Sequence, residues 1–264
     1  MIAIFAGSGN LPKEIFSTLD RTKIKYIVFN LSNKKIKNSI KIQLGQFGKI
    51  LRILKQNKVN NVIFAGYVKR PDLSSLKFDF KAVTYLPKLL KVFRRGDGNI
   101  LNFVTQILKK NKIKVIDSHK FCKHLLVNKT ISKSKPSSEN MKDLYKGRKI
   151  LDALSKFDIA QGLILDNGYV IAIESAEGTD EMLKRVIKLR LKKKNRSGVL
   201  IKLPKKKHSL RYDLPTIGYK TVQLLIKSKL NGIFLKKNQN IFLDQKRALN
   251  LANKHGIFIS ASKW

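Results

Sequence analysis

The first half of the chain alternates short apolar runs with segments of helical periodicity. Apolar runs at Ile2–Phe5, Lys25–Asn30 and Asn61–Ala65 have the length and composition of buried strands. Between them, apolar residues recur at helical spacing from Pro12 to about Leu19 and over Gly48–Asn57. This β-α-β-α-β order predicts a parallel sheet covered by helices, as in a Rossmann-like domain. Further predicted elements of this half are helices over Leu86–Phe93 and Asn99–Lys110 and a strand over Ile113–Ile116.

The second half predicts a different α/β arrangement. Gly162–Leu165 and Tyr169–Glu174 form a predicted hairpin, because Asp166-Asn167-Gly168 is a strong turn sequence between two apolar runs. A basic amphipathic helix is expected over about Asp180–Lys193. The sequence therefore predicts a C-terminal α/β domain with a mixed sheet. Its other predicted elements are helices over Met141–Lys156, Thr221–Ser228 and Asp244–Lys254 and strands over Val199–Lys202, Gly232–Leu235 and Ile257–Ser260.

A change in composition separates the two halves. Thr130–Glu139 reads TISKSKPSSE, which is rich in Ser and Lys, contains Pro and has little apolar content. Such a stretch is typical of a linker. We therefore expect an N-terminal domain over residues 1–132, a linker over 133–140 and a C-terminal domain over 141–264.

The bulk composition is that of a globular protein. The chain has 264 residues, and 43% of them are hydrophobic, which is enough for a packed core. A single cysteine, Cys122, excludes an intramolecular disulfide, and a half-buried thiol is favoured over a site shared with His119 or His124. The N-terminus lacks the pattern of a signal peptide, and no stretch approaches the ~18 apolar residues of a membrane span. We expect a cytoplasmic protein, soluble or peripheral to a membrane.

The charge is strongly basic, at +39 from 56 Lys+Arg and 17 Asp+Glu. Three interpretations stay open: a solvated surface, attraction to an anionic membrane, and binding of nucleic acid. Lysines are spread along the whole chain, whereas nucleic-acid binders concentrate basic and aromatic residues on one element. We therefore expect no dedicated nucleic-acid partner. The densest basic runs are Lys188–Arg196 and Lys202–Arg211.

A glycine-containing loop follows the first predicted strand and opens the first helix. It reads Gly7-Ser8-Gly9-Asn10-Leu11-Pro12. Glycines let a backbone approach a phosphate, and a helix N-terminus favours an anion. The third glycine of a dinucleotide fingerprint is replaced by Pro12, and the acid expected after the second strand is Asn30. A phosphate contact and a purely structural turn both stay open.

Charged residues follow the third predicted strand and begin a later helix. Gly66, Lys69 and Arg70 lie in FAGYVKRPD, just past that strand. Ligands bind at the carboxyl ends of strands in such sheets, so these residues are expected to share a crevice with the glycine loop. Arg70 can fork onto a phosphate, with an ordinary surface turn as the alternative. Asp97, in RRGDGN, caps a helix or lines the same crevice.

Acidic residues are scarce, yet they gather in ESAEGTDEM. Thr179 or Asp180 is a natural N-cap, which leaves Glu174 and Glu177 unexplained. Oxygen ligands on a loop suit a hard cation such as Mg²⁺. A further acid, Asp213, stands in RYDLPTIG and could take a metal or a proton. Lys202, Lys205 and Arg211 lie nearby in the sequence and could neutralise a phosphate.

Taken together and in order, these segments resemble the UDP-2,3-diacylglucosamine pyrophosphatases of bacterial lipid A synthesis, in the metal-dependent form typical of alphaproteobacteria. The resemblance covers essentially the whole chain. Each motif alone is weak, and it is their shared order and spacing that carry the resemblance. The segments are GSGNLP (Gly7–Pro12), GQFGK (Gly45–Lys49), FAGYVKRPD (Phe64–Asp72), RRGD (Arg94–Asp97), DIAQG (Asp158–Gly162), ESAEGTDEML (Glu174–Leu183) and RYDLPTIG (Arg211–Gly218).

The resemblance implies hydrolysis of UDP-2,3-diacylglucosamine to UMP and 2,3-diacylglucosamine 1-phosphate, by attack of water on the uridine-side phosphorus. It implies two α/β domains, with catalysis in the C-terminal one, Asp213 as the essential carboxylate, and Mg²⁺ or another divalent cation. The candidate metal ligands are Glu174, Asp180 and Asp213. An anionic inner-membrane surface is an expected partner, and a homodimer stays open. The candidate substrate contacts are Gly7, Gly9, Asn10, Leu11, Pro12, Gly66, Lys69, Arg70, Asp97, Glu177, Gly178, Thr179, Lys202, Lys205, Pro215 and Thr216.

Two other classes of function remain as alternatives. A basic RNA-binding module without catalysis would bind generic RNA with a steep dependence on salt. The acidic cluster and the lack of basic motifs with interleaved aromatics count against it. A nicotinamide-dependent oxidoreductase is the third hypothesis, and Asn30 at the position of the expected acid counts against that one.

Overall fold

The protein is described here by a computed structural model, which covers residues 1–68, 76–93, 97–205 and 214–263, with the backbone alone for residues 93 and 97–99. The chain forms two compact units, Met1–Lys123 and His124–Trp264. The division therefore lies before the predicted linker at 133–140. The reason is that residues before the linker already bond to the second unit. The amide of Ile131 donates to the carbonyl of Ile259 at 3.1 Å, and the amide of Ile259 donates to the Ser132 hydroxyl at 2.7 Å.

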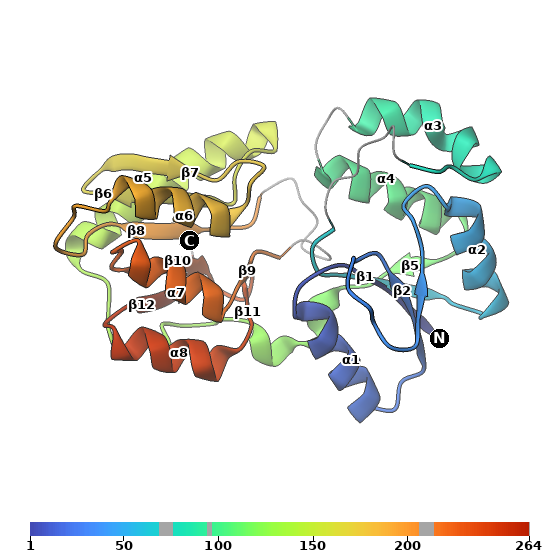
Figure 1. Ribbon diagram of the computed structural model, residues 1–264, viewed down its shortest axis with the longest axis horizontal. Helices are drawn as coiled ribbons and strands as arrows, with labels where there is room; N and C mark the ends of the chain where they lie inside the picture. Colours follow the sequence, from blue (N-terminus) through green and yellow to red (C-terminus); the bar gives the residue numbers. More distant parts are fainter. Residues whose placement is uncertain (69–75, 94–96, 206–213, 264) are drawn as a thin grey trace. The chain divides into compact units, whose positions relative to one another are not determined.

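The first unit is built on a five-stranded parallel sheet with the order β3-β2-β1-β4-β5. Helices connect most successive strands, as the alternation of apolar runs predicts (Figure 1). The strands are β1 (Ile2–Ala6), β2 (Tyr26–Asn30), β3 (Ser39–Lys41), β4 (Asn61–Ala65) and β5 (Lys114–Val115), and the helices are α1 (Leu11–Arg21), α2 (Phe47–Gln56), α3 (Phe80–Phe93) and α4 (Asp97–Lys110). Short 3₁₀ turns, η2 (Ser118–Phe121) and η3 (Lys123–Leu125), follow β5.

Aromatic side chains hold the core of this unit. Phe5 on β1 stacks on Phe29 of β2 with the ring centroids 4.9 Å apart, and it also meets Phe64 of β4 at 5.4 Å. Every residue of β1 is buried, which is expected for a central strand with helices on both faces. The carboxyl ends of β1 and β4 therefore lie side by side at one edge of the sheet, where the predicted loops begin.

The second unit contains a five-stranded mixed sheet with the order β12-β10-β8-β6-β7. Its strands β8, β10 and β12 are parallel, while β6 runs antiparallel to both β8 and β7. The strands are β6 (Gly162–Asp166), β7 (Tyr169–Ile173), β8 (Val199–Lys202), β10 (Gly232–Lys236) and β12 (Phe258–Ser262), with a small parallel pair of β9 (Thr216–Ile217) and β11 (Ile241–Phe242) beside them. The helices are α5 (Ser138–Leu154), α6 (Thr179–Leu189), α7 (Tyr219–Lys227) and α8 (Gln245–Lys254), and a 3₁₀ turn, η4 (Ser155–Phe157), follows α5.

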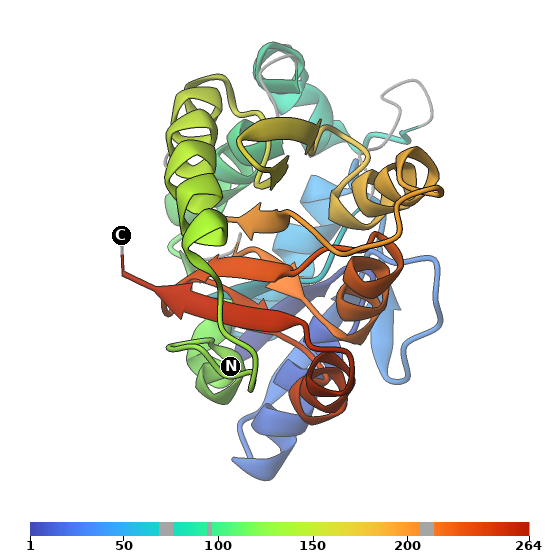
Figure 2. The ribbon, with the colours of Figure 1, turned by 90° about the vertical axis from the view of Figure 1, so that its left-hand side faces the viewer.

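Helices cover both faces of the mixed sheet. Helix α5 lies on one face, and α6, α7 and α8 lie on the other (Figure 2). The contact of α5 depends on Gly147, because a Cβ at that position would lie 2.2 Å from Cδ1 of Ile201 on β8. The sequence thus places its smallest residue where helix and sheet approach most closely.

A buried ionic cluster closes the end of β6. The Asp166 carboxylate accepts hydrogen bonds from Arg190 at 2.8 Å, Lys193 at 2.8 Å and Ser197 at 2.6 Å. Burial alone would raise the pKa of Asp166, but the bonds from Lys193 and Ser197 and the charge of Arg190 hold that pKa below its usual value. Arg190 also donates to the carbonyl of Ser197 at 2.8 Å, so its side chain ties the turn after α6 to the sheet.

The predicted fold class is confirmed, including the parallel N-terminal sheet and the mixed C-terminal one. Several predicted boundaries differ from the structure, and the largest differences are at two helix ends. Helix α3 begins at Phe80 rather than near Leu86, and α6 ends at Leu189 rather than near Lys193, because Arg190 and Lys193 turn back to Asp166. Among the described residues, no helix is long and apolar enough to cross a membrane.

Candidate active site

One edge of the mixed sheet gathers most of the predicted site residues of the second unit. Because β7 and β8 are both antiparallel to β6, they end at the same edge. Glu174 follows β7, Lys202 ends β8, and Lys236 ends the neighbouring β10. Carboxyl ends of strands in open α/β sheets are where ligands bind. The strand order therefore places a carboxylate and two lysines on the edge that is suited to a ligand.

Glu174, Thr179 and Lys202 form a connected, largely buried polar triad. The Thr179 hydroxyl donates to Oε2 of Glu174 at 2.8 Å, and Nζ of Lys202 donates to the Thr179 hydroxyl. Nζ of Lys202 also lies 3.5 Å from Oε2 of Glu174, with 5% of the lysine side chain and 12% of the glutamate side chain exposed. Gly162 makes room for this arrangement, since a Cβ there would lie 2.3 Å from Oε2 of Glu174. Three residues that lie within 28 positions of one another in the sequence therefore form one connected polar group.

The other acids of the cluster are paired with basic residues of helices. Glu177 accepts a hydrogen bond from Arg185 at 2.8 Å, and Asp180 pairs with Lys220 at 2.9 Å. Burial alone would raise the pKa of Glu177, but the hydrogen bond from Arg185 outweighs it and holds that pKa below its usual value. The hydrogen bond to Asp180, followed by its charge, raises the pKa of Lys220. Both acids therefore stabilise α6 and its contact with α7.

The predicted N-cap of α6 is wrong. The cap residue is Gly178, with φ of 81°, and the helix begins at Thr179. A residue with that φ is favoured to be glycine, and nothing lies within 4 Å of the position where its Cβ would stand. The hydroxyl of Thr179 is directed to Glu174 instead of to the helix backbone.

The described carboxylates do not by themselves make a metal site. Among residues 1–68, 76–93, 97–205 and 214–263, no group of three His, Cys, Asp or Glu side chains is placed to hold an ion. Glu174 and Asp180, two of the predicted ligands, are each paired with a lysine. The third predicted ligand, Asp213, which is also the predicted catalytic carboxylate, lies outside the described residues.

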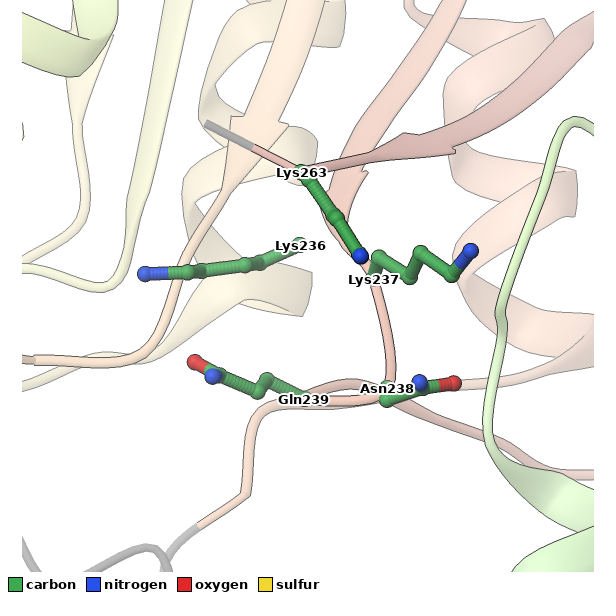
Figure 3. A pocket seen from close by; sticks show the side chains of 5 residues that line it. All are labelled: Lys236, Lys237, Asn238, Gln239 and Lys263. Atoms are coloured by element: carbon green, nitrogen blue, oxygen red, sulfur yellow. The ribbon is translucent and has the colours of Figure 1, made fainter.

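Further basic side chains line the same edge. Lys205 donates to the carbonyl and the carboxylate of Asp158 at 2.7 and 2.8 Å, so it is held against the loop that leads into β6. A depression of about 510 Å³ is lined by Lys236, Lys237, Asn238, Gln239 and Lys263 (Figure 3). Figure 3 shows Lys236 and Gln239 extending to the same side, whereas Lys263 points toward Lys237. The sequence prediction missed these lysines because nothing local distinguishes them from many others.

A buried amide organises this depression. Asn240 donates to the carbonyl of Lys202 at 3.1 Å and accepts from the amide of Lys236 at 2.8 Å, so it joins the ends of β8 and β10. The predicted contacts Pro215 and Thr216 lie close by in the fold. The carbonyl of Pro215 accepts from the amide of Ile241 at 3.0 Å, and Thr216 pairs with Ile241 in the small sheet. The chain that follows Asp213 is therefore joined to the strand that follows Gln239.

In the first unit, the glycines after β1 and β4 are needed mainly because the loops that follow these two strands pack closely together. Ser8 and Tyr67 exchange backbone hydrogen bonds of 2.7 and 2.8 Å. A Cβ on Gly7 would lie 2.4 Å from the Tyr67 carbonyl oxygen, and one on Gly66 would lie 2.5 Å from the Ser8 carbonyl oxygen. Gly9, with φ of 102°, has nothing within 4 Å of its Cβ position, so there the requirement is the backbone angle alone.

The remaining predicted residues of this unit are placed as follows. Asn10 is the N-cap of α1, Leu11 is its first residue, and Pro12 lies buried in its first turn. Asp97 is the first residue of α4, and its side chain is outside the description, as are Lys69 and Arg70 altogether. Of the predicted residues that the structure describes in this unit, Gly7, Gly9, Gly66 and the start of α1 lie at the carboxyl edge of the sheet.

Two residues that bear on the alternatives have structural roles. The side-chain oxygen of Asn30 accepts from the amide and hydroxyl of Ser32, both at 2.9 Å, so this residue closes a turn. Cys122 is fully buried, and this burial raises the pKa of its thiol to about 12. The cysteine is therefore a core residue, more buried than predicted, and no thiolate is available near neutral pH.

The sequence matches known families over both units. Residues 1–125 match the LpxI N-terminal domain, and residues 128–260 match the LpxI C-terminal domain. The chain is also 31% identical, over 268 aligned positions, to the UDP-2,3-diacylglucosamine pyrophosphatase LpxI of Caulobacter vibrioides. That alignment covers 98% of this chain and 96% of the relative. With both domains matched and in the same order, the chain belongs to the LpxI family.

Proposed function

We propose that this chain hydrolyses the pyrophosphate bond of UDP-2,3-diacylglucosamine in lipid A biosynthesis. The products are UMP and 2,3-diacylglucosamine 1-phosphate. The observation that carries the proposal is the match along nearly the full length, in both domains, to a relative named for this activity. The lysine-rich edge of the mixed sheet supports it, because a pyrophosphate diester carries two negative charges that a site must offset.

The chemistry assigns separate tasks to the residues of this edge. Water adds to the uridine-side phosphorus, the bond from that phosphorus to the bridging oxygen breaks, and the bridging oxygen leaves with the sugar phosphate. The proton of the water is taken up by a carboxylate, for which we propose Asp213. Lys202, Lys236 and Lys263 neutralise the phosphates, and Glu174 with Thr179 fixes the direction of the Lys202 ammonium.

A divalent cation is part of the proposal as an expectation only. Mg²⁺ would neutralise phosphate charge and polarise the scissile group. Since Glu174 and Asp180 are held by Lys202 and Lys220, a cation at this edge would depend on Asp213. No step of the reaction is therefore assigned to it.

The test is release of UMP from detergent-solubilised UDP-2,3-diacylglucosamine. We expect turnover by the native chain, and a loss of about a thousandfold or more in Asp213→Asn, in line with removal of a general base together with its charge. Native thermal unfolding of the variant serves as the control for folding. Full activity of Asp213→Asn would remove the assignment, and absence of UMP release by the native chain, with and without Mg²⁺, would remove the function. Loss of turnover in EDTA and its return with Mg²⁺ would support the cation.

We also propose that the protein works at the cytoplasmic face of the inner membrane. The substrate carries two acyl chains, and the net charge of +39 favours an anionic surface. Such attraction is screened by salt. Vesicle sedimentation at low and high ionic strength tests it.

A further inference from the structure

Helix α3 is fixed to the first unit along one face. Tyr85 lies between two aromatic rings, with its centroid 6.3 Å from Phe47 of α2 and 6.2 Å from Phe103 of α4. Ala82 and Leu89 are 1% and 6% exposed and complete this buried face. Figure 1 shows α3 beside α2 and α4 at the outside of the unit. One face of α3 is therefore fixed against α2 and α4, and the opposite face points away from them.

That other face carries an exposed apolar stripe. Phe80 is 90% exposed, Val83 is 51% exposed and Leu90 is 44% exposed, and Pro87 is exposed between them. The spacing i, i+3, i+7 and i+10 places these residues on one side of a helix. Exposed large apolar residues that gather in one row mark an interaction surface more often than isolated ones do.

Exposed lysines border the stripe. Lys88 and Lys91 are exposed on the same helix, and residues 80–93 contain no acid. Lys81 is also exposed, but its Cβ lies 3.2 Å from the place where a Cβ on Gly48 of α2 would stand, so it lies beside α2. The residue before the helix is an acid, Asp79, whose carboxylate accepts from the amide of Lys49 at 3.0 Å and from the amide of Ala82 at 2.8 Å. The carboxylate of Asp79 therefore helps to begin α2 and α3.

The first turn of α3 lies near the carboxyl edge of the parallel sheet. The amide of Asp79 donates to the carbonyl of Gly45 at 3.1 Å, and Gly45 lies in the short connection from the carboxyl end of β3 to α2. The loops that follow β1 and β4 leave the same edge, because all these strands are parallel. Phe80 therefore projects from the edge at which a substrate is expected.

We propose that α3 docks this protein on an anionic lipid bilayer. Phe80, Val83 and Leu90 enter the interfacial region, and Lys88 and Lys91 contact lipid phosphates, which is the arrangement of an interfacial amphipathic helix. The proposal rests on the proposed function, since a diacylated substrate resides in a membrane. A second copy of the chain fits this face less well, because the lysines of the two copies would repel each other. A single acyl chain also fits this face less well, because the apolar stripe lies on the exposed side of the helix.

The experiment is co-sedimentation with vesicles of phosphatidylethanolamine and phosphatidylglycerol at 3:1, compared with phosphatidylcholine vesicles. We expect Phe80→Ser/Leu90→Ser to weaken binding to the anionic vesicles by at least about tenfold. Lys88→Gln/Lys91→Gln should weaken it roughly thirtyfold and reduce its salt dependence. The matched control is Leu189→Ser/Leu191→Ser, which changes two other leucines, 65% and 72% exposed, that also stand among lysines. This control should bind as the native chain does.

UMP release from detergent-solubilised substrate separates docking from catalysis. Both α3 variants should keep native turnover and a native unfolding temperature while losing vesicle binding. Native vesicle binding by both α3 variants would overturn the proposal, as would an equal loss in the leucine control. A raised KM in detergent with unchanged vesicle binding would assign the stripe to acyl chains instead. A change confined to sedimentation velocity would assign it to a second copy. A native chain that binds vesicles but releases no UMP would defeat the proposed function and leave the docking surface standing.

Discussion

The largely buried ion pair of Glu174 and Lys202 allows a test of how the candidate active site is stabilised. The perturbations are Glu174→Gln and Lys202→Met, made singly and together. At a separation of 3.5 Å and an effective dielectric constant of about 20, the gross attraction is about 5 kcal/mol. Much of that is offset by the cost of burying both charges. Removing one partner leaves the other buried and uncompensated, which costs about 3–5 kcal/mol.

The double variant should therefore cost about as much as either single one, rather than their sum. We expect a coupling free energy of roughly 2–4 kcal/mol between the two substitutions. The assay is urea unfolding followed by circular dichroism, analysed for the second unit. The control is Glu181→Gln, which breaks a shorter pair, 2.7 Å from Lys184, whose side chains are about half exposed. Solvent screening makes that exposed pair worth under about 1 kcal/mol.

The same variants separate the two roles that Glu174 could have. If the lysine is its partner, the cost of Glu174→Gln stays the same in EDTA and in Mg²⁺. If a cation is the partner of Glu174, the loss of stability in Glu174→Gln should be present in Mg²⁺ and absent in EDTA. That loss should then add to the loss caused by Lys202→Met. Additive costs together with a dependence on Mg²⁺ would refute the reasoning from the ion pair.

Three other substitutions test the frame around the site. Asp166→Asn leaves Arg190 buried without its carboxylate and should lower the free energy of unfolding by about 3–5 kcal/mol at neutral pH. Because the folded pKa of Asp166 is lowered, that difference should persist above about pH 4 and shrink as the pH falls through the folded pKa, which a pH series of thermal melts will reveal. Asp79→Ala removes the acceptor for the first turns of two helices and should cost about 2 kcal/mol in urea unfolding. Lys236→Ala/Lys263→Ala should raise KM for the sugar nucleotide roughly tenfold with native stability, and an unchanged KM would exclude this depression as a phosphate contact.

The α/β architecture could be predicted because burial leaves a direct record in the sequence. Asn61–Ala65 and Val199–Lys202 were predicted with the bounds that the structure has, since each is a short apolar run with polar neighbours. β3 was missed because Ser39–Lys41 is short, only partly buried and lies at the edge of its sheet. An edge strand is specified by its neighbour more than by its own pattern.

The candidate site was harder to predict, because its contacts join residues far apart in sequence. The acidic cluster was visible, but its members turn out to be bound to Lys202, Arg185 and Lys220, which no local pattern indicates. Thr179 resembled an N-cap, yet Gly178 occupies the cap, and the hydroxyl serves Glu174. Local propensity describes what a residue can do, whereas the tertiary contact decides between the choices.

The excess of basic over acidic residues has a structural consequence. With 17 acids against 56 basic residues, an acid placed in the interior fixes the position of the cation that it contacts. Asp166 does this for Arg190 at one edge of the mixed sheet, and Glu174 does it for Lys202 at the other. Lysines held in this way are rigid and partly dehydrated, so they can meet a phosphate at lower entropic cost than freely rotating surface lysines. The lysines of α3 have no such constraint from an acid on their own helix, and long flexible side chains suit a fluid lipid surface better than a fixed phosphate. We therefore expect the two sets to respond differently to salt, with vesicle binding falling steeply and substrate KM changing little.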